Sequence, residues 1–238
     1  MSTGPRPQGP RKKGPQKKSN VKVPSVGKGG GTGAGGDNRR LAAIAGGAAL
    51  ILVAVIAAYF VFAGGSSASA NAPKLLETAG CTVQAVKSLP SNDHSVLKPT
   101  GTSKKWNTNP PTSGPHYAVP LVWGAYTDPV NLAQAVHNLE HGGIYIFYGN
   151  KVPSPTVDEL RTFYDKHTQA TILAPLPRLG NKIALGAWTT NSASQPDNGV
   201  ARLVKCTNFD DKAFTAFFSA YQGKGPERFP MSSLLPGS

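Results

Sequence analysis

Apolar and polar positions in the second half of the chain follow the periods of strands and helices. Ile144–Tyr148 is continuously apolar, which is typical of a strand buried on both faces, and Thr171–Ala174 is a second such run. Between them, residues 155–167 repeat apolar side chains at helical spacing, Leu160 and Phe163 among them. A strand, a helix and a strand in this order favour a right-handed parallel unit.

Later segments extend the pattern. Ile183–Thr189 and Val200–Cys206 are joined by a polar turn, which predicts a β-hairpin, and Asp210–Tyr221 is an amphipathic helix. An extended piece is expected near Cys81, and Gly223–Ser238 is expected to be a tail over the surface. About 160 residues with these elements predict a single α+β domain, in which one mixed β-sheet packs against helices.

Two helix starts carry recognisable signals. Asp128 and Pro129 have the order of an N-cap and a first helical residue, ahead of a helix over Asn131–His141. Thr156 and Glu159 have the spacing of a capping box at the start of the later helix.

The first 40 residues lack the apolar content that a core requires. They hold ten Lys or Arg, one acid, ten Gly and five Pro, so they supply +9 (10 minus 1) of the formal net charge of +13. Residues 1–40 are therefore expected to be a disordered basic tail. Each basic residue held near anionic lipid headgroups contributes about 1 kcal/mol. Without interleaved aromatic residues the tail favours a membrane surface over nucleic acid, and a tail that only fixes topology is the alternative.

Leu41–Ala63 is a stretch of 23 residues without a charge. As a helix rising 1.5 Å per residue it is about 35 Å long, enough to cross a hydrocarbon core of roughly 30 Å. Arg39 and Arg40 precede it, and the first charge after it is Lys74. This asymmetry predicts a single-pass membrane protein with a cytoplasmic N-terminus.

The rest of the chain is then outside the cytoplasm. We expect a linker over residues 64–75 and an extracytoplasmic domain over residues 76–238. Ala68-Ser69-Ala70 resembles a signal-peptidase site, but the apolar stretch is longer than that of a usual signal peptide, which favours an uncleaved anchor. Both interpretations export the domain.

Export of the domain bears on the redox state of the two cysteines. Cys81 and Cys206 are the only ones in the chain, and in an oxidising compartment one disulfide between them is the simplest expectation. Two separate buried thiols, or a metal site that includes a cysteine, are the alternatives.

Candidate chemistry is concentrated in residues 136–143, V-H-N-L-E-H-G-G. If this segment is helical up to the glycines, His137 and His141 lie one turn apart on one face, and Glu140 lies beside them. Two imidazoles so placed can share one metal ion. The spacing is also the H-x-x-E-H signature of inverted zinc proteases, in which both histidines bind zinc and the glutamate activates water.

A third imidazole comes from a proline-rich segment. Residues 109–117, N-P-P-T-S-G-P-H-Y, have fixed φ angles at several positions and present His116 and Tyr117 from a stiffened turn. We predict that His116 joins the two helix histidines in a metal site, with Glu140 as fourth ligand or as their partner. Three imidazoles and a carboxylate suit zinc, and imidazole-rich sites outside the cell also suit copper.

The same residues allow another interpretation. Imidazoles at a helix C-terminus are favoured by the helix dipole, Glu140 can pair with a Lys or Arg, and Gly142 can end the helix. The cluster is then a structural node in a protein-interaction module of the cell envelope, whose partner the sequence does not name.

A zinc peptidase is the third interpretation. It requires one more protein ligand further along the chain, and no catalytic residue is assigned without it. Seven carboxylates follow, at Asp158, Glu159, Asp165, Asp197, Asp210, Asp211 and Glu227. His94 and His167 lie outside the pattern and are expected at the surface.

Three blocks follow one another in the chain, N-P-P-T-S-G-P-H-Y at 109–117, W-G-A-Y at 123–126 and H-N-L-E-H-G at 137–142. Together they resemble the bacterial family known as domain of unknown function 3105 (DUF3105), over roughly Cys81 to Tyr221. The resemblance implies a membrane-anchored or exported envelope domain and brings no established activity. Its motif positions are His116, Tyr117, His137, Asn138, Glu140 and His141. Tyr117 and Asn138 are expected to contact a bound ligand.

Overall fold

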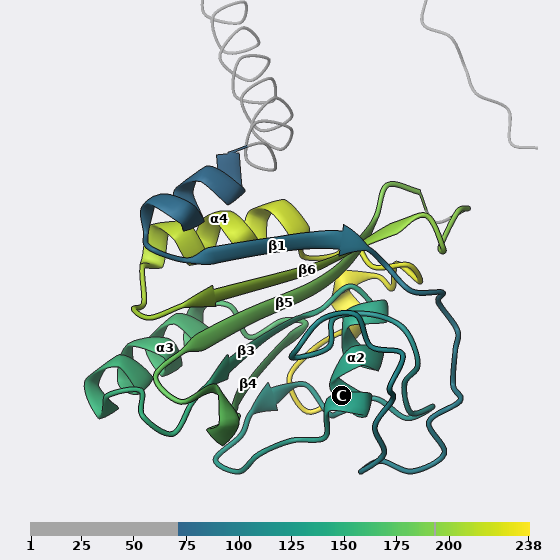
Figure 1. The fold of residues 1–238 in the computed structure, drawn as a ribbon, viewed down its shortest axis with the longest axis horizontal. Helices are drawn as coiled ribbons and strands as arrows, with labels where there is room; N and C mark the ends of the chain where they lie inside the picture. The colour runs from purple at the N-terminus through teal and green to yellow at the C-terminus, as the bar shows by residue number, and fades with distance from the viewer. Residues whose placement is uncertain (1–70, 193) are drawn as a thin grey trace, which may run out of the picture. The chain divides into compact units, whose positions relative to one another are not determined.

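The apolar run of the sequence becomes the middle of a β-sheet. A computed structural model describes residues 71–192 and 194–238 (Figure 1). In it β3 (Ile144–Tyr148) pairs in parallel with β4 (Thr171–Pro175) and antiparallel with β5 (Ile183–Thr190). Helix α3 (Ser154–Lys166) connects β3 to β4. The predicted strand, helix and strand unit is therefore present.

The sheet has six strands in the order β1-β6-β5-β3-β4-β2, which Figure 1 shows side by side for the five strands it labels. Strand β6 (Gly199–Cys206) forms the expected hairpin with β5, and β1 (Thr82–Lys87) pairs antiparallel with β6 at one edge. The short β2 (Gly124–Ala125) pairs in parallel with β4 at the other edge. The mixed sheet and its helices confirm the α+β prediction.

Side chains of β3 alternate between two apolar cores, one on each face of the sheet. Ile144 and Ile146 belong to the first core, which also contains residues of α3 and of α4 (Asp211–Tyr221). Tyr145 and Phe147 belong to the second core, together with residues of α2 (Leu132–Glu140). The candidate site lies on this second side, where α2 packs.

A buried loop completes the cover of the second face. Residues 110–116 are all buried, although they form no helix or strand. Their carbonyl groups accept hydrogen bonds, since the core residue Tyr145 donates its Oη to Pro111 O (3.3 Å) and the half-buried Trp106 donates its Nε1 to Pro115 O (2.8 Å). The proline-rich segment is thus a packed wall that ends at His116.

Both predicted N-caps are wrong. The N-cap of α2 is Asn131, without a side-chain hydrogen bond, because Val130 packs against the second core before the helix begins. Helix α3 begins at Ser154, so Thr156 is already inside its first turn. Pro155 lies in that turn, where proline needs no partner for its missing N–H.

Residues 71–78 are helical, and Ala72 and Leu76 are completely buried in the first core. The helix therefore includes residues 71–75, which the composition assigns to a linker. Among residues 71–192 and 194–238, no helix is long and apolar enough to span a membrane. The expected tail (1–40) and membrane segment (41–63) lie outside the described residues.

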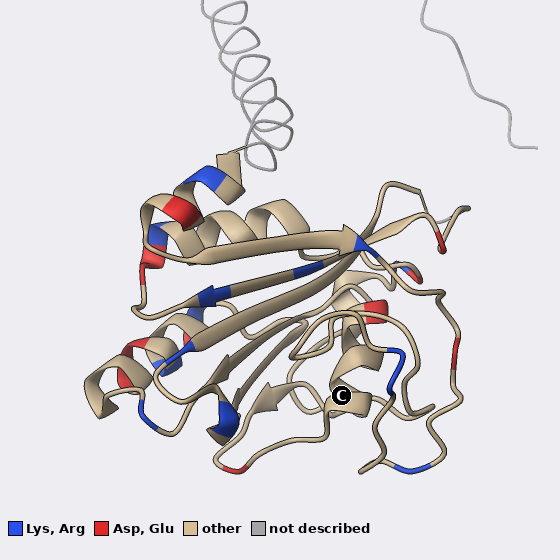
Figure 2. Ribbon diagram, in the orientation of Figure 1, with Lys and Arg blue, Asp and Glu red and all other residues tan. Residues whose placement is uncertain are grey.

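Charge is evenly distributed over the domain. The 15 Lys or Arg and 11 Asp or Glu beyond residue 40 leave a net charge of only +4 (15 minus 11). Figure 2 shows basic and acidic residues interspersed over the described part. The strongly basic character of the chain therefore comes from its first 40 residues.

The predicted disulfide is present. Cys81 and Cys206 are bonded across 125 residues of sequence, at the start of β1 and the end of β6. The adjacent residues Thr82 and Lys205 are paired between β1 and β6. The bond therefore holds the edge strand to its neighbour, and closing so long a loop stabilises the fold by about 4–5 kcal/mol in the chain-entropy model.

We expect the double substitution Cys81→Ser and Cys206→Ser to lower the free energy of unfolding by about 2–5 kcal/mol. Denaturant titration followed by tryptophan fluorescence measures the change. Alkylation of the wild-type protein without reductant is the control, and labelling of either thiol there would contradict the bond.

Candidate metal centre

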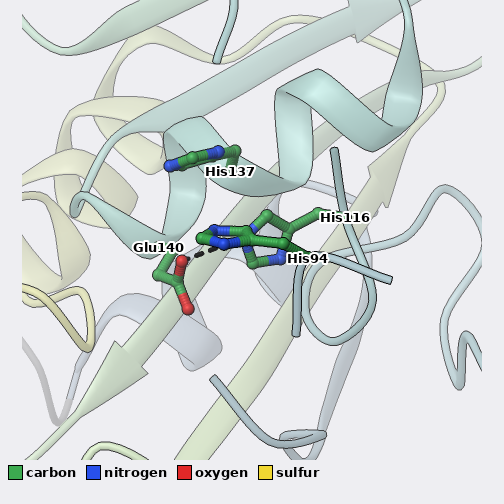
Figure 3. Close-up of side chains that lie close together, drawn as sticks. All are labelled: His94, His116, His137 and Glu140. Carbon is green, nitrogen blue, oxygen red and sulfur yellow. Dashed lines mark ion pairs between the residues drawn. The ribbon is translucent and has the colours of Figure 1, made fainter. Parts of the chain in front are cut away.

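A buried ion pair lies at the centre of the site. His116 Nε2 and Glu140 Oε2 are 3.0 Å apart, and both side chains are completely buried (Figure 3). Neither atom has a hydrogen bond, so the pair is close without hydrogen-bond alignment. The other oxygen, Glu140 Oε1, accepts a 2.6 Å hydrogen bond from the backbone N–H of Asn92.

Asn92 has a left-handed backbone conformation, with φ of 55°. Asparagine adopts this conformation more readily than most residues. The loop that contains Asn92 also places His94, whose backbone N–H donates to Asn92 O (3.2 Å). One tight turn therefore supplies both a donor to Glu140 and a further imidazole.

Two histidines have a defined tautomer. His116 Nδ1 lies 2.8 Å from Gly114 O, and His137 Nδ1 lies 2.8 Å from Tyr117 O. Because a carbonyl oxygen only accepts, each Nδ1 must donate its proton. In the neutral ring the lone pair is then on Nε2, which is the arrangement that protein backbones impose on metal-binding histidines.

Three imidazole rings contact one another at this point. The centroids of His94 and His116 are 4.7 Å apart, those of His116 and His137 are 4.8 Å apart, and those of His94 and His137 are 5.1 Å apart. Figure 3 shows the three rings grouped near the Glu140 carboxylate. His94 is exposed, whereas His116, His137 and Glu140 are buried.

The electrostatics of the site follow from burial and from this pairing. Burial lowers the pKa of His116, but the Glu140 carboxylate and the Gly114 carbonyl outweigh that effect and raise it. Burial raises the pKa of Glu140, but His116 and the Asn92 N–H outweigh it, and the pKa is lowered. Burial lowers the pKa of His137. His137 is therefore neutral at pH 7, with a free lone pair.

These residues are a set of possible metal ligands. One ligand atom from each of His94, His116, His137 and Glu140 lies within 4.8 Å of all the others. Imidazole nitrogens and a carboxylate are the donors that zinc and copper take. His94 is the exposed member of the set.

A second group of possible ligands shares His137. His141 Nε2 lies 3.0 Å from Glu227 Oε2, and ligand atoms of His137, His141 and Glu227 all lie within 4.8 Å of one another. Burial lowers the pKa of His141 to about 4, so this imidazole too is neutral at pH 7. Burial raises the pKa of Glu227, and the nearby Glu140 carboxylate adds to the shift.

The end of α2 explains how Glu227 reaches His141. Gly142 N donates to Leu139 O and Gly143 N donates to Asn138 O, both at 3.0 Å. With Gly142 at φ of +96°, this is a Schellman motif. The carbonyl of Glu140 stays free of the helix and accepts the backbone N–H of Glu227 at 3.1 Å.

Two backbones approach closely at this junction. Gly223 N donates to Gly142 O at 2.8 Å. A Cβ atom on Gly225 would lie 2.3 Å from Gly142 N and 2.4 Å from Glu140 O. Residues 223–227 therefore pack against the helix end, and they are not the surface tail that the composition predicts.

The two predicted ligand contacts have structural partners. The side chain of Asn138 accepts from Leu121 N and donates to Leu121 O, both at 2.8 Å. The carbonyl of Tyr117 accepts a hydrogen bond from His137 Nδ1, and the backbone N–H of Tyr117 donates to Ala133 O at 3.2 Å. Both residues hold the walls of the site, and contact with a bound ligand stays a prediction for them.

The structure brings together His116, His137 and Glu140 as the sequence predicts, and it places His141 in the neighbouring group. The sequence did not predict two residues of these groups, His94 and Glu227. His94 is exposed, as expected, but belongs to the cluster, and Glu227 was one of seven carboxylates without a distinguishing feature. The chain has only five histidines, so each of them, His94 included, was a candidate for a histidine cluster.

An α+β domain with a histidine and glutamate cluster at a helix C-terminus is thus the class that fold and site define. The family model described as "Protein of unknown function (DUF3105)" matches residues 98–232, more than half of the chain. The protein belongs to this family. No curated protein matches the chain, and no solved structure matches it either.

Gly225→Ala tests the close approach at the helix end. We expect the added Cβ atom to force the two backbones apart and to lower the free energy of unfolding by about 1–3 kcal/mol. Gly124→Ala is the matched control, because a Cβ atom there meets nothing within 4 Å. Denaturant titration compares the two, and equal stability would contradict the packing described here.

Proposed function

We propose that this protein binds a transition-metal ion, zinc or copper, through His116, His137 and Glu140, with His94 completing the shell. The observation that carries the proposal is the orientation of two imidazoles. Both Nδ1 atoms donate to backbone carbonyls, which leaves Nε2 as the metal-binding nitrogen of each ring beside one buried carboxylate, that of His116 once its proton is displaced. A hydrogen bond from the other ring nitrogen fixes the orientation of metal-binding histidines in known sites.

The separation of His116 Nε2 and Glu140 Oε2 supports the proposal. Two atoms that share one zinc ion at about 2.1 Å lie roughly 3.0–3.4 Å apart for angles between about 90° and 109°. The observed separation is 3.0 Å, and the pair lacks hydrogen-bond alignment. An ion between them would replace the proton of His116 and neutralise the carboxylate, with release of that proton.

We propose further that the domain is held outside the cytoplasm by the uncharged stretch at residues 41–63. The disulfide supports this location, because such bonds persist in oxidising compartments. A small ligand with donor atoms of its own could bind through the same ion or cluster.

One rival has an observation in its favour. Glu140 is already compensated by His116 and by the Asn92 N–H, which suits a structural node in an interaction module. Burial of such a pair does not require an ion. Metal content therefore decides between the two functions.

We expect the full-length protein, purified without a histidine tag and equilibrated with Zn²⁺, to retain the ion through dialysis. His116→Ala and His137→Ala should each lower the retained zinc strongly, because each removes one of the few ligands. Elemental analysis of the dialysed proteins measures the content.

His167→Ala is the matched control for these variants. His167 Nδ1 also lies 2.8 Å from a backbone carbonyl, that of Phe163, but the residue belongs to neither ligand group. Equal zinc content in the wild type and in both site variants would contradict the proposed metal site. The structural node in an interaction module would then be the remaining function.

Glu140→Gln separates metal binding from peptidase chemistry. A zinc peptidase would use Glu140 to activate water, so the variant would keep zinc and lose cleavage. We expect instead that the variant loses zinc affinity by about 10- to 100-fold or more. Loss of a group that only hydrogen-bonds to a metal ligand already lowers affinity by that factor. Competition with a chelator measures the affinity, and an unchanged value would contradict the role of Glu140 as a ligand.

A further inference from the structure

A second set of possible ligands lies beside the proposed centre, and two of its members are more exposed than the buried pair His116 and Glu140. The side chains of His141 and Glu227 are 14% and 26% exposed, whereas those of His116 and Glu140 are fully buried. His141 lines a surface cavity of about 400 Å³ beside Trp123, and Glu227 lines another of about 380 Å³. An ion from solvent therefore meets His141 and Glu227 without displacing the buried pair.

His137 belongs to both ligand sets. Its ring centroid lies 4.8 Å from that of His116 and 4.6 Å from that of His141. Its Nδ1 is occupied by the Tyr117 carbonyl. Only Nε2 is left, and one neutral imidazole nitrogen binds one ion at a time. The two positions therefore cannot both hold an ion through His137.

Glu227 is held in place by the backbone. Its N–H donates to the carbonyl of Glu140, and Gly225 packs against Gly142 just before it. The Glu140 carboxylate lies close enough to Glu227 to disfavour its charge, and it raises the pKa of Glu227 together with burial. A cation at either position relieves this repulsion.

We propose that His137, His141 and Glu227 form an entry position, from which a transition-metal ion passes to the buried centre by exchange around His137. Bonds to His141 and Glu227 break, bonds to His116 and Glu140 form, and the proton of His116 leaves to solvent. No electron is transferred. The inference rests on the proposed function and adds the route by which the ion arrives.

The test uses the full-length protein, Zn²⁺ alone as the probe and a chromogenic chelator as the competitor. Glu227→Gln removes the charge of the entry position without touching the buried ligands. We expect transfer of zinc between protein and chelator to slow by about tenfold, the lower end of what charged clefts contribute to association rates. The transfer rate should fall more than the zinc retained at equilibrium, because Glu227 is not a ligand of the buried centre, and Glu159→Gln on α3 is the matched carboxylate control.

A second variant examines the entry position itself. His116→Gln should leave a weaker zinc site at His137, His141 and Glu227, and the added substitution His141→Ala should abolish it. The wild type should bind one zinc ion per chain, because the two positions share one nitrogen.

Four outcomes would overturn the inference. Unchanged transfer rates in Glu227→Gln would remove the entry role, and a rate lowered only in His94→Ala would place entry at the other side of the cluster. Two zinc ions per chain would contradict the shared ligand. Zinc binding that is absent from the wild type would overturn the proposed function as well, so the two failures are distinguishable.

Discussion

The side chain of Glu140 is completely buried, and a carboxylate removed from water costs several kcal/mol unless charge and hydrogen bonds compensate it. The compensation comes from outside its own helix. Asn92 donates a backbone N–H and His116 supplies an imidazole, and both belong to the segment between β1 and β2. Residues 110–116 consequently lie against the second face of the sheet, and the same constraint brings His94 beside His137.

The position of this carboxylate at the end of α2 matters for its chemistry. Carbonyl groups at a helix C-terminus carry partial negative charge, which favours a cation. The Schellman motif uses the carbonyls of Asn138 and Leu139, and residues 223–227 take those of Glu140 and Gly142. These four carbonyls are therefore satisfied by backbone N–H groups, so the candidate ligand atoms of the site belong to side chains.

Periodicity predicted the elements of the fold well and their contacts poorly. Strand β3 and helix α3 follow from local pattern, because burial on one or both faces leaves a repeat in the sequence. Helix starts did not follow, since Val130 packs before α2 begins and Pro155 takes the first turn of α3. His116 and His137 were predicted together from the order of motifs. Glu227 could not be predicted, because its place depends on a backbone contact between Gly225 and Gly142 that has no local signature.

His167 shows why the tautomer alone does not make a site. Its Nδ1 meets a backbone carbonyl at the same 2.8 Å as that of His116, yet its ring stacks on Phe163 with centroids 4.1 Å apart. His167 belongs to neither group of possible metal ligands among the described residues. At His116 and His137 a ring nitrogen of each lies in one group with the buried carboxylate of Glu140. The difference between an ordinary helix histidine and a candidate ligand is therefore tertiary, and it arises from the loop that Glu140 holds in place.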